Sequence, residues 1–159
     1  MGIDSFYYPV NKETSEKIDR IWNQLTNNSK GQFEVVEVAQ GRTIPVEKSA
    51  KGVAEFTFKE LCEDARGSSD YAAIAKNYNS IILRGVPRQN MTRRDLLRRF
   101  ILLIDTMYYQ HRNVVIEAES SIDELFDIDE NTKQEHVFDE EFAYTRCLSR
   151  LREMQTKEY

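Results

Sequence analysis

The last nineteen residues, EFAYTRCLSRLREMQTKEY (141–159), hold the side chains of this chain that are best suited to binding an anion. At about 100° per residue, a helix here places one polar stripe opposite an apolar face. The polar stripe consists of Arg146, Ser149, Arg150 and Glu153, and the apolar face of Tyr144, Cys147, Leu148, Leu151 and Met154. Arginine presents a planar fork to phosphate oxygens, so the stripe could contact a phosphate. The alternative is a solvated face on which Arg150 and Glu153 form a weak pair at i,i+3.

A second group of arginines stands where a helix is expected to begin: Arg93, Arg94, Arg98 and Arg99. Positive charge at this end opposes the helix macrodipole, which is mildly unfavourable and suggests a function. A purely structural explanation is also available. Asp95 and Arg99 have the i,i+4 spacing of a surface pair, and Asp105 shares a face with Arg98 and could bind it.

Several kinds of catalytic site are not supported by the sequence. None of the six glycines begins the G-x-x-x-x-G-K-[ST] run that wraps a triphosphate. The run IILRGV resembles the strand of a Walker B segment, but Arg84 and Gly85 replace the acidic pair that would handle magnesium. The two cysteines form no CxxC pair, and His111 and His136 stand apart, so we expect no structural zinc. His136 near Asp139 and Glu140 is more typical of a flexible acidic loop than of a metal site.

The composition is that of one ordinary globular domain. The 159 residues carry 22 Lys plus Arg and 27 Asp plus Glu, for a net charge of -5, which argues against a general nucleic-acid-binding surface. No apolar run approaches the roughly 20 residues that span a bilayer. The first ten residues resemble neither a signal peptide nor a transit peptide.

The first half of the chain predicts one helix followed by short antiparallel strands. Asn11 is expected to cap a helix that runs to about Thr26. Residues 33–58 then form a β-hairpin region, with strands at 33–38, 42–47 and 53–56. FKELCED and SSDYAAIAKNY predict short helices, the second with Ser69 as N-cap.

The second half predicts a βαβ unit over 79–119 and a terminal helix. The unit consists of an apolar strand at 79–87, a helix at 92–110 that starts with Thr92 and Asp95 as a capping box, and a strand at 113–119. Its strands are expected to be buried in a parallel sheet whose other strands lie upstream. SSIDELF predicts a short helix, 127–137 a flexible acidic loop, and 138–159 the C-terminal helix.

Five ordered segments resemble one known family. They are GRTIPV, VAEFTFKELC, SSDYAAIAKNYNSIILRGVP, RRFILLIDTMYY and FAYTRCLSRLREMQTKEY. They are similar to the C-terminal part of the ZapE-type ATPases, known in eukaryotes as the lactation-elevated (AFG-like) mitochondrial AAA+ ATPases. Small departures are Tyr144 for a usual Phe, Cys147 for a usual Thr, and VIEAE where the family has a strand that ends in Ser-Ala.

The resemblance implies a fold class, α/β, as the C-terminal portion of a P-loop AAA+ ATPase fold. It implies that residues 1–159 are a single partial domain whose family carries Walker A, Walker B and sensor-1 segments upstream. The complete protein would bind ATP and Mg²⁺ and hydrolyse ATP, whereas this chain alone is expected to be inactive. AAA+ proteins use late arginines to contact the γ-phosphate, so Arg98, Arg99, Arg146 and Arg150 become candidates for an arginine finger or sensor.

The resemblance also implies a cellular setting. The complete protein would be a homo-oligomer in mitochondrial protein quality control, with client proteins and peripheral association with the inner mitochondrial membrane, or a cytoplasmic protein if bacterial. No nucleic acid is expected as a partner. The alternative function is a non-catalytic interaction module that binds ATPase subunits or client proteins.

Overall fold

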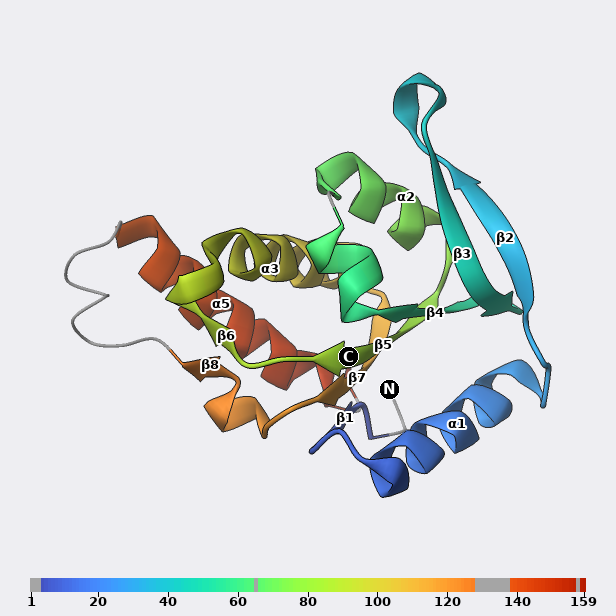
Figure 1. Ribbon diagram of the computed structural model, residues 1–159, viewed down its shortest axis with the longest axis horizontal. Helices are drawn as coiled ribbons and strands as arrows, with labels where there is room; N and C mark the ends of the chain where they lie inside the picture. The colour runs from blue at the N-terminus through green and yellow to red at the C-terminus, as the bar shows by residue number, and fades with distance from the viewer. Residues whose placement is uncertain (1–3, 65, 128–137, 157) are drawn as a thin grey trace.

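The fold has three layers, with one sheet between two layers of helices (Figure 1). The computed structural model describes residues 4–64, 66–127, 138–156 and 158–159. The six-stranded sheet has the order β1-β7-β5-β4-β3-β2. Helix α1 covers one face, and α2, α3 and α5 cover the other. The protein is therefore α/β with a predominantly parallel sheet, consistent with a portion of a P-loop AAA+ fold.

The sheet joins a parallel part to an antiparallel part. Strands β1 (Phe6–Tyr7), β7 (Asn113–Ala118), β5 (Ser80–Val86) and β4 (Val53–Thr57) pair in parallel. Strands β3 (Thr43–Ala50) and β2 (Gln32–Glu37) continue the sheet in antiparallel pairing. The two strands of the predicted βαβ unit find parallel neighbours within this chain, and not only upstream of it as expected: β5 is flanked by β4 and β7, and β1 pairs with β7.

Helix α1 (Lys12–Thr26) begins where the sequence predicts it to begin. Asn11 accepts the backbone N–H of Thr14 through its Oδ1, at 2.9 Å, which confirms the predicted cap. The buried stripe of α1 packs on the sheet, so this helix closes a separate apolar cluster. The cluster comprises Ile18, Ile21, Trp22, Val53, Ile82 and Val115.

Two predicted helix caps are wrong. Helix α2 (Ser68–Asn77) is preceded by Gly67, whose N–H donates to Asp70 at 2.7 Å, so Ser69 lies inside the helix. Helix α3 (Arg94–Tyr109) follows a 3₁₀ turn at Met91–Arg93, and Asn90, just before that turn, accepts the N–H of Thr92 at 3.0 Å, so Thr92 does not cap the helix. At both helix starts, a residue other than the predicted cap accepts the free backbone N–H: Asp70 at α2 and Asn90 before α3. Sequence spacing alone does not determine which acceptor reaches such a donor.

The C-terminal helix α5 (Phe138–Met154) packs along α3 in the same direction and is shorter than predicted. The chain turns back after Met154, and the hydroxyl of Tyr159 donates to the carbonyl oxygens of Met107 at 3.2 Å and Arg112 at 2.8 Å. A small parallel pair, β6 (Gln89–Asn90) and β8 (Phe126–Asp127), lies beside the main sheet. Residues 128–137, where an acidic loop is predicted, lie outside the described residues. Across the part of the chain described, none of the helices is long and apolar enough to cross a membrane.

Candidate functional site

The C-terminal arginine stripe faces α3. Asp105 of α3 accepts from Arg150 at 2.6 Å and from Arg146 at 3.4 Å. The pairing of Arg150 with Glu153, considered from the sequence, is replaced: Glu153 accepts from the hydroxyl of Tyr108 at 2.7 Å. Arg150 is therefore part of the contact between α5 and α3, whereas Arg146 lies largely at the surface.

Arg150 is largely buried and contacts Asp105, Tyr108 and Tyr109 of α3. Only 13% of its side chain is exposed, and its Nη2 donates to the hydroxyl of Tyr109 at 2.9 Å. The guanidinium lies 4.9 Å from the ring centre of Tyr108 and 4.7 Å from that of Tyr109. Burial lowers the pKa of Arg150, but the bonds to Asp105 and Tyr109 outweigh it and raise the pKa above its ordinary value. Arg150 is thus a permanently charged link between α5 and α3.

Arg146 is held far more loosely. Its side chain is 51% exposed, and it shares a carboxylate that Arg150 already binds at shorter range. An exposed ion pair at 3.4 Å contributes little and is easily exchanged for another anion. Of the two arginines on this stripe, Arg146 is the one that can move without breaking the helix contact.

The two candidates on α3 point in different directions. Arg98 is exposed, two helical turns before Asp105 and on the same face. Arg99 instead donates through Nη1 to the carbonyl oxygens of Cys62 at 3.0 Å and Glu63 at 3.4 Å, at the end of the π-helical turn Lys59–Glu63. The expected partners also differ, since Asp95 pairs with Arg93 and Asp105 with the arginines of α5. The structure thus brings Arg146 and Arg150 together at Asp105, places Arg98 two turns away on the same side of α3, and turns Arg99 toward Cys62 and Glu63.

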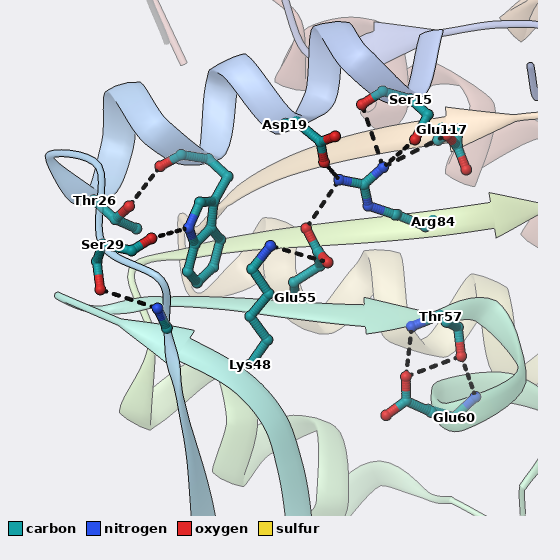
Figure 2. Close-up of polar contacts among 12 residues, drawn as sticks. Ser15, Asp19, Thr26, Ser29, Lys48, Glu55, Thr57, Glu60, Arg84 and Glu117 are labelled. Atoms are coloured by element: carbon teal, nitrogen blue, oxygen red, sulfur yellow. Dashed lines mark hydrogen bonds and ion pairs between the residues drawn. The ribbon is translucent and has the colours of Figure 1, made fainter. Parts of the chain in front are cut away.

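Sequence reasoning missed an ion cluster that centres on Arg84 and joins α1, β4, β5 and β7 (Figure 2). Its Nη2 contacts Asp19 of α1 at 2.6 Å and Glu55 of β4 at 3.2 Å, and its Nη1 lies 3.8 Å from Glu117 of β7. The Arg84 side chain is 16% exposed, and its Nε has no hydrogen-bond partner among the described residues. Burial lowers the pKa of Arg84, but Glu55 and Asp19 more than compensate and raise it. The sequence does contain a sign of this cluster: Arg84, Glu55 and Glu117 are each the single charged residue in an otherwise apolar run, SIILRGV, VAEFT and NVVIEA respectively.

An open cleft of about 450 Å³ lies beside this cluster, at the carboxyl ends of β4 and β5. Ligands of α/β sheets bind at such ends. Here, however, the backbone N–H of Thr57 already donates to Glu60 at 2.9 Å, and that of Gly85 to Glu117 at 3.2 Å. Carboxylates that occupy the strand-end amides repel phosphate rather than bind it.

The described residues therefore do not fit Mg²⁺–ATP as a complete site. Within residues 4–64, 66–127, 138–156 and 158–159, no group of three or more His, Cys, Asp or Glu side chains could hold a metal ion. None of the six glycines in the sequence begins a glycine-rich phosphate loop. What the chain does offer toward an anion is the α3–α5 face with its loosely held Arg146.

Comparison with known proteins gives one consistent result. A family described as AFG1-like ATPase matches residues 3–159. The chain is 31% identical to Lactation elevated protein 1 homolog B of Danio rerio, over 97% of this chain and 35% of that protein. It is 31% identical to Cell division protein ZapE of Escherichia coli, over 95% of this chain and 38% of that protein. An uncharacterised protein of Schizosaccharomyces pombe is 30% identical over 98% of this chain and 39% of its own length. The chain thus spans somewhat more than a third of these relatives, and no solved structure gives a significant match.

Proposed function

The chain belongs to the AFG1-like ATPase family, and from that premise we propose that it serves an ATP-hydrolysing protein as a region that responds to nucleotide. In this proposal ATP and Mg²⁺ are held by residues outside this chain. The amides at its own strand ends are occupied by carboxylates, and its sequence has no Walker A or Walker B motif.

Arg146 is the residue that we assign to the phosphate. The observation that carries the assignment is the contrast within one helix. Arg150 is enclosed by Asp105, Tyr108 and Tyr109, whereas Arg146 is half exposed and bound only at 3.4 Å among its described contacts. A guanidinium that approaches a triphosphate offsets the negative charge that develops on the transferred group. Arg98, on the same face, is the second candidate.

The wider setting is proposed from the family alone. The complete protein would be a homo-oligomer that acts on client proteins. In a eukaryote it would act in mitochondrial protein quality control with peripheral attachment to the inner membrane, and in a bacterium in the cytoplasm. The Danio rerio and Escherichia coli relatives match the same region of this chain, so the proposal applies to either setting.

The test is a chimera in which this chain replaces the matching region of a family member that hydrolyses ATP. Arg146→Ala should lower ATP turnover by roughly 10³-fold or more, as loss of an arginine finger does. It should leave the melting temperature within about 2 °C of the parent. Arg152→Ala is the matched control, because it removes the same charge from the same helix at an exposed pair with Asp123. Equal turnover in both variants would refute the assignment of Arg146.

The isolated chain provides a second test. We expect its ATP turnover to stay far below about 1 per second, the lower end of ordinary enzyme rates. Turnover at that rate, in a preparation shown by mass spectrometry to be free of other ATPases, would overturn the proposal that the phosphates are held elsewhere. The alternative function, a non-catalytic interaction module, is favoured by the exposed apolar side chains of β2. It predicts that Arg146→Ala leaves turnover unchanged.

A further inference from the structure

Strand β2 forms one edge of the sheet, and its outward backbone groups can be assigned from the pairing (Figure 1). The N–H of Val38 donates to the carbonyl of Arg42 at 2.8 Å, so this pair is hydrogen-bonded. Hydrogen-bonded and non-hydrogen-bonded pairs alternate in an antiparallel ladder. The pairs Val35–Pro45 and Glu37–Thr43 are therefore non-hydrogen-bonded, which suits a proline. The N–H and C=O groups of Val35 and Glu37 consequently point away from β3, toward the free edge.

The side chains along this edge are unusually apolar for an exposed strand. Phe33 is 56% exposed and Val35 is 52% exposed, and both lie on the same side of the strand. Exposed Pro45 of β3 lies opposite Val35 and extends the apolar surface. Edge strands are commonly protected by lysine, proline or a bulge; β2 contains neither lysine nor proline, and the irregularity in its pairing lies between Gln32 and Glu34, before Val35. The edge thus combines free backbone groups with an uncovered apolar row.

Negative charge lies on both sides of this edge. Glu37 lies on the same side of β2 as Val35, whereas Glu34 lies on the opposite side and accepts from the hydroxyl of Tyr78 at 3.1 Å. Glu47 lies on the adjoining part of β3. Two of the nearby cations are already paired, Lys48 with Glu55 and Arg42 with Asp70. A second copy of the chain would bring two such acidic edges together, whereas a basic segment would be attracted.

We propose that β2 is a docking edge for an extended peptide segment in which apolar residues alternate with lysine or arginine. The segment would add to the sheet as a seventh strand through the outward backbone groups of Val35 and Glu37. Its apolar side chains would cover Phe33 and Val35, and its basic side chains, on the opposite face, would meet Glu34. This mode of recognition takes affinity from the main chain and selectivity from alternate side chains. The proposal is independent of the role assigned to Arg146.

The probe is a fluorescent twelve-residue peptide of alternating valine and lysine, titrated with the 159-residue chain and followed by anisotropy. Val35→Lys should weaken binding at least about tenfold, which corresponds to loss of one well-buried apolar contact. Val10→Lys is the matched control, since Val10 is also 52% exposed but lies before α1. It should change the affinity less than about twofold, a difference well under 1 kcal/mol. Glu37→Lys, which leaves the apolar row intact, should weaken binding and flatten its dependence on salt.

Three further measurements separate strand addition from other attractions. A peptide with a central proline should bind much more weakly, because it loses a main-chain donor. Binding of the proline peptide with equal affinity would show simple charge attraction and overturn the proposal. A peptide of alternating valine and glutamate should not bind, and equal binding of that peptide would also overturn it. Sedimentation could instead show that the chain is a dimer and that Val35→Lys dissociates it. That result would overturn the proposal, because the occupant of the edge would then be a second copy of the chain and not a basic segment.

Discussion

Arg150→Ala should destabilise this protein much more than Arg152→Ala, although the bond made by Arg152 is the shorter of the two. Arg152 contacts Asp123 at 2.5 Å and Arg150 contacts Asp105 at 2.6 Å. The difference lies in exposure. The Arg152 side chain is 55% exposed and that of its partner 72%, so water and salt screen the pair and its loss costs no more than about 0.5 kcal/mol.

The cost at Arg150 follows from its contacts. Its hydrogen bond to the largely buried carboxylate of Asp105 contributes about 1.5–3 kcal/mol. Stacking on Tyr108 and Tyr109 adds about 0.5–1 kcal/mol. Part of the guanidinium reaches solvent, which favours the lower ends of these ranges, so we expect a total of about 2–3 kcal/mol. In a chain of this length that lowers the melting temperature by about 4–10 °C.

The assay is thermal unfolding followed by circular dichroism, with both single variants, Asp105→Ala and the Asp105→Ala/Arg150→Ala double variant. The double-mutant cycle should give a coupling energy of about 1–2 kcal/mol, because the two side chains share one contact. A shift at Arg150 no larger than that at Arg152 would refute the reasoning that exposure, rather than distance, determines these energies.

Three other predictions concern the sheet and its helices. Arg84→Ala should cost about 3 kcal/mol in urea unfolding, because it leaves the carboxylates of Asp19, Glu55 and Glu117 together without their cation; an unchanged midpoint would contradict this. Stability should fall as pH rises from about 10 to 12, because burial, assisted by Glu34, raises the pKa of Tyr78 to about 12, so that the unfolded state loses this proton first. Tyr78→Phe should lessen that fall in melting temperatures measured across this pH range. Ile82→Ala should lower the free energy of unfolding in urea by about 2–5 kcal/mol, since Ile82 of β5 is fully buried in the cluster that α1 closes.

The sequence by itself determined the family and most of the elements. Apolar residues at helical spacing in 12–26 and 94–109 predict α1 and α3, and the short apolar runs at 80–86 and 113–118 predict β5 and β7. These signals are local, because the period of burial along one segment depends only on that segment's own geometry. The ordered motifs likewise identified an AFG-like ATPase, in agreement with the family match over residues 3–159.

Only the tertiary structure decided which strands are neighbours and which charges meet. β4 is predicted in an antiparallel region and pairs with β3 in that way, yet its other edge pairs in parallel with β5, and no local pattern records both partners. Asp105 stands seven residues from Arg98 but binds Arg150, 45 residues away. Arg84 likewise binds Asp19 across 65 residues. Ion pairs depend on where packed elements place their side chains, and packing is determined by the apolar core. The apolar pattern could therefore be read in advance, whereas the arginine contacts became defined only after the helices and strands had packed.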